Sequence, residues 1–213
     1  MIAQQHRRPG CAVQWGAFAL GFLAIWPALL SGAWLQSRIL LEARSAAAAL
    51  WYAALPEELT KLAVGILPVL SGAPGILVGL GFGLSETVFL ASASPWPIRL
   101  LTTVPLHAGT TALALLLFEL RRRDGAVLKS GTDTRQHRSP HLTPGEASHP
   151  VPPMLRALLI TAAAITLLTA AIILHWIYNL AARQGSLLIW PLAWLPMVLW
   201  LTLRGLLHGQ SQH

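Results

Sequence analysis

Hydrophobic residues dominate six long runs of the chain, and short polar segments separate these runs. Each run has about 20 residues or more, the length that a helix needs to cross the hydrocarbon core of a bilayer. In lipid a helix satisfies its own backbone hydrogen bonds. The pattern therefore predicts an all-α fold, a polytopic membrane helix bundle of about six transmembrane helices. The predicted spans are residues 12–35, 46–70, 74–93, 98–120, 154–181 and 186–207.

Composition supports a membrane protein and points to lipid as its surroundings. Of the 213 residues, 54% are hydrophobic and only 11% are charged, which is too apolar for an ordinary soluble domain. We expect a single transmembrane domain over residues 1–213. The net charge is +7, but the basic residues lie between the runs and not along one amphipathic face. The expected partner is therefore the lipid bilayer and not nucleic acid.

The distribution of lysine and arginine predicts the orientation. With the N-terminus inside and six crossings, most of these residues fall on the cytoplasmic side, where basic residues accumulate. The outer segments hold only Arg38, Arg44, Arg99 and Arg183. We expect a multi-pass protein of the plasma membrane with both termini cytoplasmic. Residues 121–153 are rich in Arg, His, Pro, Ser and Gly and lack apolar periodicity, which predicts a flexible cytoplasmic loop.

Charged residues inside the second run are the first candidates for function. The hexapeptide Pro56–Lys61 carries Glu57, Glu58 and Lys61, and a charge at the centre of a bilayer costs about 3 kcal/mol or more. Pro56 can end one short helix and begin another. Lys61 lies within one helical turn of both glutamates, so it can pair with either. We expect Lys61 to support the glutamates as their counter-ion.

Further polar side chains lie within three later runs: Glu86, His107, His175 and Asn179. At a rise of about 1.5 Å per residue, Glu57 and the first three of these residues all fall in the outer half of the membrane. Asn179 lies four residues after His175 and shares its helix face. The common depth predicts one site near the extracytoplasmic face.

Other polar or small residues are expected to serve the structure. Glycines repeat every four residues at 75, 79 and 83, a pattern that predicts close helix packing. Arg99 is expected to cap the outer interface, and Glu119 to pair with the arginines at 121–123. Hydroxyl groups within the fourth run are expected to bond back to their own helix. These hydroxyls belong to Thr102, Thr103, Thr110 and Thr111.

Carboxylates beside imidazoles in a low-dielectric cavity suit hydrolysis by an activated water. A glutamate would act as the general base, and a histidine or Asn179 would donate to the developing oxyanion. Alternatively, the same glutamates and histidines could hold a divalent metal such as zinc that activates the water. The residues leave both mechanisms open. They also leave open a proton- or cation-coupled transporter, although no inverted repeat is visible.

Four motifs within these runs resemble, in order, those of the PrsW family of intramembrane proteases. Pro56–Lys61 resembles the Glu-Glu-x-x-Lys motif, and Phe82-x-x-x-Glu86 resembles the second. Arg99 followed by Pro105–Gly109 resembles the third, and His175–Asn179 the fourth. The resemblance covers residues 50–180, and the family is related to the type II CAAX prenyl proteases.

The resemblance implies an intramembrane endopeptidase of the metallo- or glutamate type. Glu57 or Glu58 would activate the water, and Glu86, His107, His175 and Asn179 would complete the site as metal ligands or oxyanion donors. A metal would be held by ligands drawn from Glu58, Glu86, His107 and His175. The implied substrate is a membrane-anchored protein, such as an anti-sigma factor, cut near the extracytoplasmic face. The alternative is a non-catalytic membrane scaffold of the same fold.

Overall fold

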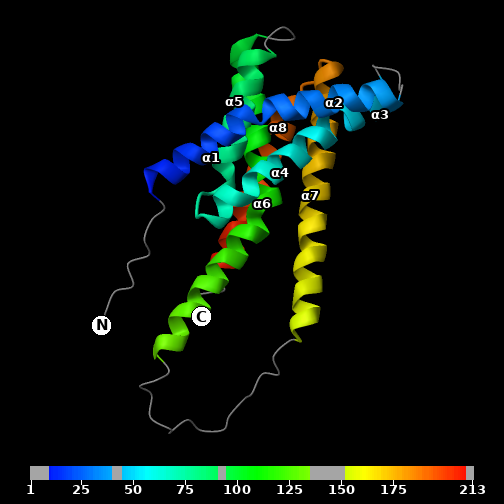
Figure 1. Ribbon diagram of the computed structural model, residues 1–213. Helices are drawn as coiled ribbons and strands as arrows, with labels where there is room; N and C mark the ends of the chain where they lie inside the picture. Colours follow the sequence, from blue (N-terminus) through cyan, green and yellow to red (C-terminus); the bar gives the residue numbers. More distant parts are fainter. Residues whose placement is uncertain (1–9, 40–44, 91–94, 135–151, 210–213) are drawn as a thin grey trace.

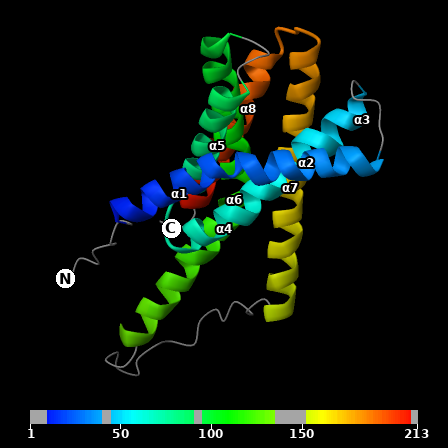
Figure 2. The ribbon, with the colours of Figure 1, turned by 45° about the horizontal axis from the view of Figure 1, so that its top comes forward.

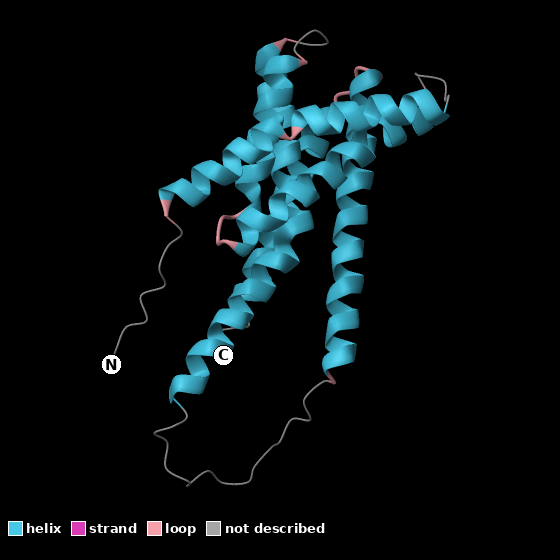
Figure 3. Cartoon of the chain, viewed as in Figure 1, coloured by secondary structure: helices cyan, strands magenta, loops and turns pink. Residues whose placement is uncertain are grey.

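The computed structural model describes residues 10–39, 45–90, 95–134 and 152–209, and these residues form helices without any strand (Figures 1 and 3). The prediction of an all-α protein is confirmed for this part of the chain. The helices are α1 (Cys11–Leu23), α2 (Ile25–Ile39), α3 (Ala46–Ala49), the π-helix η1 (Leu50–Ala54), α4 (Leu55–Leu70), α5 (Gly75–Phe89), α6 (Trp96–Thr134), α7 (Pro153–Arg183) and α8 (Ile189–Gly209).

Four helical stretches are long and apolar enough to cross a membrane. They are Cys11–Ile39, Trp96–Arg122, Leu158–Arg183 and Ile189–Leu207, and they correspond to four of the six predicted spans. The other two predicted spans coincide with α3–η1–α4 and with α5. The first of these carries three charges, and α5 has only 15 residues, about 22 Å against a hydrocarbon core of about 30 Å. The count of six crossings is therefore not confirmed.

The predicted break at Pro56 takes the form of a π-turn. Proline has no N–H to donate to the carbonyl group four residues earlier, so the regular α-helical bonding pattern cannot pass through it. The chain switches to η1, in which the Leu55 N–H bonds to the Leu50 carbonyl, and α4 then begins with Pro56 in its first turn. The π-turn lies directly before Glu57 and Glu58. Turns of this kind are frequent at functional sites.

Glycines allow α5 to contact α6 and α1 at backbone distance. A Cβ atom on Gly79 would lie 2.2 Å from the His107 carbonyl oxygen, and one on Gly83 would lie 2.8 Å from the Val104 Cα atom. On the α1 side, a Cβ atom on Gly81 would lie 2.1 Å from the Phe18 carbonyl oxygen. The close packing predicted from the glycine repeat is confirmed. It brings α5 directly against the part of α6 that carries His107.

Polar side chains from α6 hold both ends of α5. At the N-terminal end, Glu119 Oε1 accepts a hydrogen bond of 2.7 Å from the Gly75 N–H, which satisfies one of the unpaired donors of the first turn. Glu119 is also expected to pair with the arginines at 121–123; the side chain of Arg123 lies outside the described residues, so that pairing stays a prediction. At the C-terminal end, the Arg99 guanidinium donates to the carbonyl oxygens of Leu90 and Glu86.

The predicted loop at 121–153 begins later than expected. Helix α6 continues to Thr134, and the stretch after Arg121 contains no helix-breaking proline before Pro140. Residues 135–151 of the predicted loop lie outside the described residues. Only the backbone is described for residues 123–134.

The arrangement of the helices defines one meeting point. Helix α4 contacts α5, α6 and α7, and in both ribbon views α1 and α2 run across the direction of α7 and not along it (Figures 1 and 2). The charged first turns of α4 therefore face three other helices. This meeting point holds the candidate site.

Candidate functional site

Side chains from four helices meet here: Glu57, Glu58 and Lys61 from α4, Glu86 from α5, His107 from α6 and His175 from α7. Their side chains range from fully buried for Glu58, Lys61 and His107 to 17% exposed for Glu86. The imidazole rings of His107 and His175 lie 4.9 Å apart, centre to centre, and nearly perpendicular to each other. Residues separated by more than 100 positions in the sequence thus share one buried polar cluster.

The Lys61 ammonium group makes three contacts in this cluster. Its Nζ atom lies 2.5 Å from Glu58 Oε1, 2.9 Å from His107 Nδ1 and 3.2 Å from Thr110 Oγ1. An ammonium group has three hydrogens and can only donate, so the three contacts use all of its donors. His107 Nδ1 must then accept, and the hydrogen of this imidazole is on Nε2. Lys61 is the counter-ion of Glu58, and it also fixes the tautomer of His107.

Glu58 orients the other histidine. Its Oε1 atom accepts from His175 Nδ1 at 2.8 Å and from the Thr110 hydroxyl at 3.1 Å, in addition to Lys61. Because a carboxylate only accepts, the hydrogen of His175 is on Nδ1 and Nε2 carries a free lone pair. Glu58 therefore has the geometry of a positioning residue whose Oε1 atom is fully engaged.

Glu86 and Arg99 form the outer wall of the cluster. Glu86 Oε2 accepts from His107 Nε2, and Glu86 Oε1 accepts from Arg99 Nη2 at 2.8 Å. Arg99 is only 8% exposed, and it fixes the Glu86 carboxylate and the end of α5. Its predicted place at the outer interface stays a prediction. Fixing Glu86 in turn fixes the acceptor for the His107 N–H.

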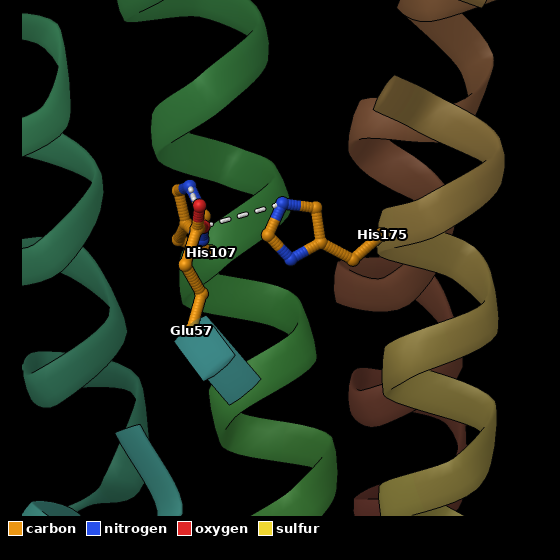
Figure 4. A group of neighbouring side chains, drawn as sticks. All are labelled: Glu57, His107 and His175. Carbon is orange, nitrogen blue, oxygen red and sulfur yellow. Dashed lines mark ion pairs between the residues drawn. The ribbon is translucent and has the colours of Figure 1, made fainter. Parts of the chain in front are cut away.

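Glu57 differs from Glu58 in what lies beside its free oxygen. The Oε2 atoms of both glutamates are buried and make no hydrogen bond within the described structure. Glu57 Oε2 lies 3.4 Å from His175 Nε2 and 3.9 Å from His107 Nε2, and Figure 4 shows the Glu57 carboxylate beside the His107 ring with a dashed line to His175. Since His175 Nε2 has a lone pair, Glu57 Oε2 and His175 Nε2 are two acceptors that face each other.

The spacing of this group is close to that of a metal site, but its hydrogen bonding does not suit one. One ligand atom each from Glu57, His107 and His175 lies within 4.8 Å of the others, a limit wider than the separation of up to about 4 Å between zinc ligands at about 2.1 Å from the metal. A metal needs a lone pair on each ligand nitrogen, whereas His107 Nε2 carries a hydrogen as long as Lys61 donates to Nδ1. The site as arranged does not fit a metal bound by both histidines.

The predicted metal-ligand set overlaps only in part with the group that the structure brings within metal-binding distance. It includes Glu58 and Glu86, but among the described residues the metal-compatible group contains Glu57 in their place. The reason is that Glu58 and Glu86 are each engaged by cations and imidazole N–H groups. The two adjacent glutamates of α4 thus have different surroundings, which the sequence does not distinguish.

Asn179, Thr103 and Thr111 deviate from their expected places. Asn179 lies one turn beyond His175, is half-buried, and is absent from the described hydrogen bonds of the cluster. Thr102 bonds back to the Ile98 carbonyl as predicted. Thr103 instead contacts the Tyr178 hydroxyl, and the Thr111 hydroxyl has no hydrogen bond within the described structure.

Thr110 is the member of the cluster that sequence reasoning missed. The expectation is a bond to its own helix only, and it does lie 3.4 Å from the His107 carbonyl. Its hydroxyl also accepts from Lys61 and donates to Glu58. The sequence did contain a signal for this role, because Thr110 lies three residues after His107 and therefore on the same helix face.

Comparison of the chain with known protein families, with curated proteins and with solved structures finds no match.

Proposed function

We propose that the chain is an intramembrane endopeptidase that hydrolyses a membrane-anchored protein with a water molecule activated by Glu57. The observation that carries the proposal is the pair of facing acceptors, Glu57 Oε2 and His175 Nε2, 3.4 Å apart in a buried cluster. A water that donates one hydrogen to each acceptor turns its lone pairs away from both. Such a water is oriented as a nucleophile.

In the proposed reaction the water oxygen attacks the carbonyl carbon of the scissile peptide while Glu57 takes the proton. The tetrahedral intermediate carries its negative charge on the former carbonyl oxygen. His107 Nε2–H, 3.9 Å from Glu57 Oε2, stabilises the charge in this proposal by turning from its hydrogen bond with Glu86 Oε2 to the developing oxyanion. Glu57 then returns the proton to the leaving amine, so the glutamate ends the reaction in its starting state.

Glu58, Lys61 and Thr110 act as positioning residues in this proposal. Glu58 keeps the hydrogen of His175 on Nδ1, so that Nε2 can accept from the water. Lys61, supported by Thr110, keeps the hydrogen of His107 on Nε2, so that it can donate. The proposed mechanism uses no metal. With its hydrogen on Nε2, His107 can donate from that atom but has no lone pair there with which to bind a metal.

We further propose six crossings with both termini in the cytoplasm of a plasma-membrane protein. Helices α4 and α5 would complete the six as inner helices. Their charged side chains face other helices, as ionisable groups inside a membrane usually do. The cut would fall toward the extracytoplasmic side, and a membrane-anchored anti-sigma factor is the substrate class that the family resemblance suggests.

Cleavage by the purified full-length protein in proteoliposomes tests the proposal. The probe is a single-span fusion protein with a fluorescent tag on its extracytoplasmic end. Glu57→Gln should slow cleavage by about 10²–10⁴-fold with little change in thermal unfolding, because Glu57 Oε2 has no hydrogen-bonded partner to lose. Glu119→Gln is the matched control, a buried carboxylate outside the site whose replacement should leave cleavage unchanged.

Two outcomes would contradict the proposal. Normal cleavage by Glu57→Gln would remove the base from the mechanism. A folded wild-type protein that cleaves no single-span probe, combined with loss of thermal stability in Glu57→Gln and Glu58→Gln alike, would favour the non-catalytic scaffold. In that case the buried ion pairs between α4, α6 and α7 would serve only to hold these helices together.

A further inference from the structure

A bridge of three hydroxyl groups joins α6 to α7 beside the imidazole pair of the candidate site. The Tyr178 hydroxyl of α7 donates to Thr102 Oγ1 of α6 at 2.9 Å and lies 3.4 Å from Thr103 Oγ1. The three residues are between 1% and 8% exposed, so this hydroxyl bridge is buried. Tyr178 follows His175 by three residues, and Thr103 precedes His107 by four. The bridge therefore lies about one helical turn from both histidines.

The direction of each hydrogen bond in the hydroxyl bridge can be assigned. The Thr102 hydroxyl donates to the Ile98 carbonyl oxygen at 2.8 Å, so its oxygen accepts from Tyr178. Because a hydroxyl group has a single hydrogen to donate, the Tyr178 oxygen then accepts from Thr103. The hydrogen bonds run in one direction and end at a backbone carbonyl group. Each hydroxyl hydrogen of the bridge is used, which favours one fixed arrangement of α6 and α7 at this level.

The contacts of His175 with α4 do not fix its distance from α6. Its ring nitrogens lie 2.8 Å and 3.4 Å from carboxylate oxygens of α4. Its contact with His107 is between the two rings, whose centres lie 4.9 Å apart. Tyr178 supplies the attachment to α6: its hydroxyl bonds to that helix, and its side chain shares a buried cluster with Leu106, the residue before His107.

We propose that Tyr178 is a positioning residue, which through Thr102 and Thr103 holds His175 at its distance from His107. The inference rests on the proposed function, in which His175 orients the water and His107 stabilises the oxyanion. The two imidazoles belong to different helices, so a shift of α7 against α6 would move one and leave the other in place. A misplacement of about 1 Å can lower turnover by about 10²-fold.

Cleavage kinetics of the full-length protein test the role in the reaction. Tyr178→Phe keeps the ring and removes only the hydroxyl group, and the Thr103 hydroxyl can then bond back to its own helix. We expect kcat per folded protein to fall by about 10–100-fold with little change in KM. Thr102→Val removes the acceptor of the bridge and should lower kcat in the same way.

Magic-angle-spinning NMR of histidine-labelled protein in proteoliposomes tests the position of His175 without any substrate. The readout is the carbon–carbon cross-peak between the rings of His107 and His175, which Tyr178→Phe should weaken. The matched control is Trp176→Phe, because Trp176 Nε1–H also attaches α7 by one hydrogen bond, of 2.9 Å to the Ala46 carbonyl oxygen, but to α3 and not to α6. Trp176→Phe should leave kcat and the cross-peak unchanged.

Two outcomes would overturn the positioning role. One is a wild-type kcat in both Tyr178→Phe and Thr102→Val. The other is an equal loss of kcat in Tyr178→Phe and Trp176→Phe, which would mean that any bond holding α7 has the same effect. If the wild-type protein cleaves no single-span probe, the proposed function fails and the cross-peak alone decides. Its weakening in Tyr178→Phe would still support the bridge as the element that positions His175, and an unchanged cross-peak would exclude it.

Discussion

Replacing Lys61 by methionine should convert the candidate site from one that excludes metal into one that binds it. The Lys61 ammonium donates to His107 Nδ1 at 2.9 Å and thereby keeps a hydrogen on Nε2. Without that donor His107 can carry its hydrogen on Nδ1, and its Nε2 lone pair becomes available. The ligand atoms of Glu57, His107 and His175 already lie within 4.8 Å of one another.

The magnitude of the change follows from the contacts that are lost. Lys61 and Glu58 form a fully buried ion pair, and removing one partner of such a pair costs about 3–5 kcal/mol of stability. Holding a catalytic histidine in the wrong tautomer lowers turnover by up to about 10⁴-fold in a serine protease triad, the known precedent. We therefore expect Lys61→Met to be less stable and nearly inactive.

The double variant Lys61→Met/Glu58→Gln distinguishes a change in the His107 tautomer from a loss of folding stability. It removes both members of the ion pair, and the amide oxygen introduced by Glu58→Gln can still accept from His175 Nδ1. We expect this variant to fold and to take up about one zinc ion per chain, measured by elemental analysis after gel filtration, whereas wild type takes up none. Thr110→Val, which removes one contact of Lys61 and leaves its contact with His107, is the control and should bind no zinc.

Two results would refute this reasoning. Stoichiometric zinc in active wild-type protein, with activity lost on chelation and restored by zinc, would mean that the metal mechanism is correct. Absence of zinc from a folded double variant would mean that Lys61 does not control the availability of the His107 nitrogen. Nitrogen-15 spectra of labelled histidines measure the tautomer directly, with His107→Gln used for assignment.

Two further substitutions test the packing around the cluster. Gly79→Ala would place a methyl group 2.2 Å from the His107 carbonyl oxygen. We expect it to lower the free energy of unfolding by about 1–3 kcal/mol and to reduce cleavage. Gly16→Ala, with no atom within 4 Å of its Cβ, is the control and should leave both unchanged. Arg99→Lys removes the planar guanidinium that reaches both the Glu86 carboxylate and the end of α5; we expect a loss of about 1–3 kcal/mol, and unchanged thermal unfolding would show that these contacts are not needed.

Much of the cluster could be predicted because membrane burial makes polar residues conspicuous. Glu57, Glu58, Glu86, His107 and His175 stand out against apolar runs, and counting residues from the span ends gave them a common depth. The glycine repeat at α5 was equally informative, because small residues every four positions leave few alternatives to close helix contact.

Other features could not be predicted because they depend on directions that spacing does not give. Adjacent residues on a helix point about 100° apart, so the motif alone could not tell which of Glu57 and Glu58 faces the histidines. Thr110 was missed because a threonine in an apolar helix usually bonds to its own backbone. The count of six spans stays a prediction, since α4 carries three charges and α5 has only 15 residues.

The π-turn η1 has a consequence for how this motif can change. A π-turn takes in one residue more than an α-turn, so the helix after Leu50–Ala54 is wound about 100° out of register with the helix before it. The side chains of Glu57 and Glu58, as adjacent residues of one helix, also point about 100° apart. The division of labour between Glu57 and Glu58 is therefore set upstream of both, and deleting a single residue from η1 would be enough to turn the second glutamate toward the position that the first now holds.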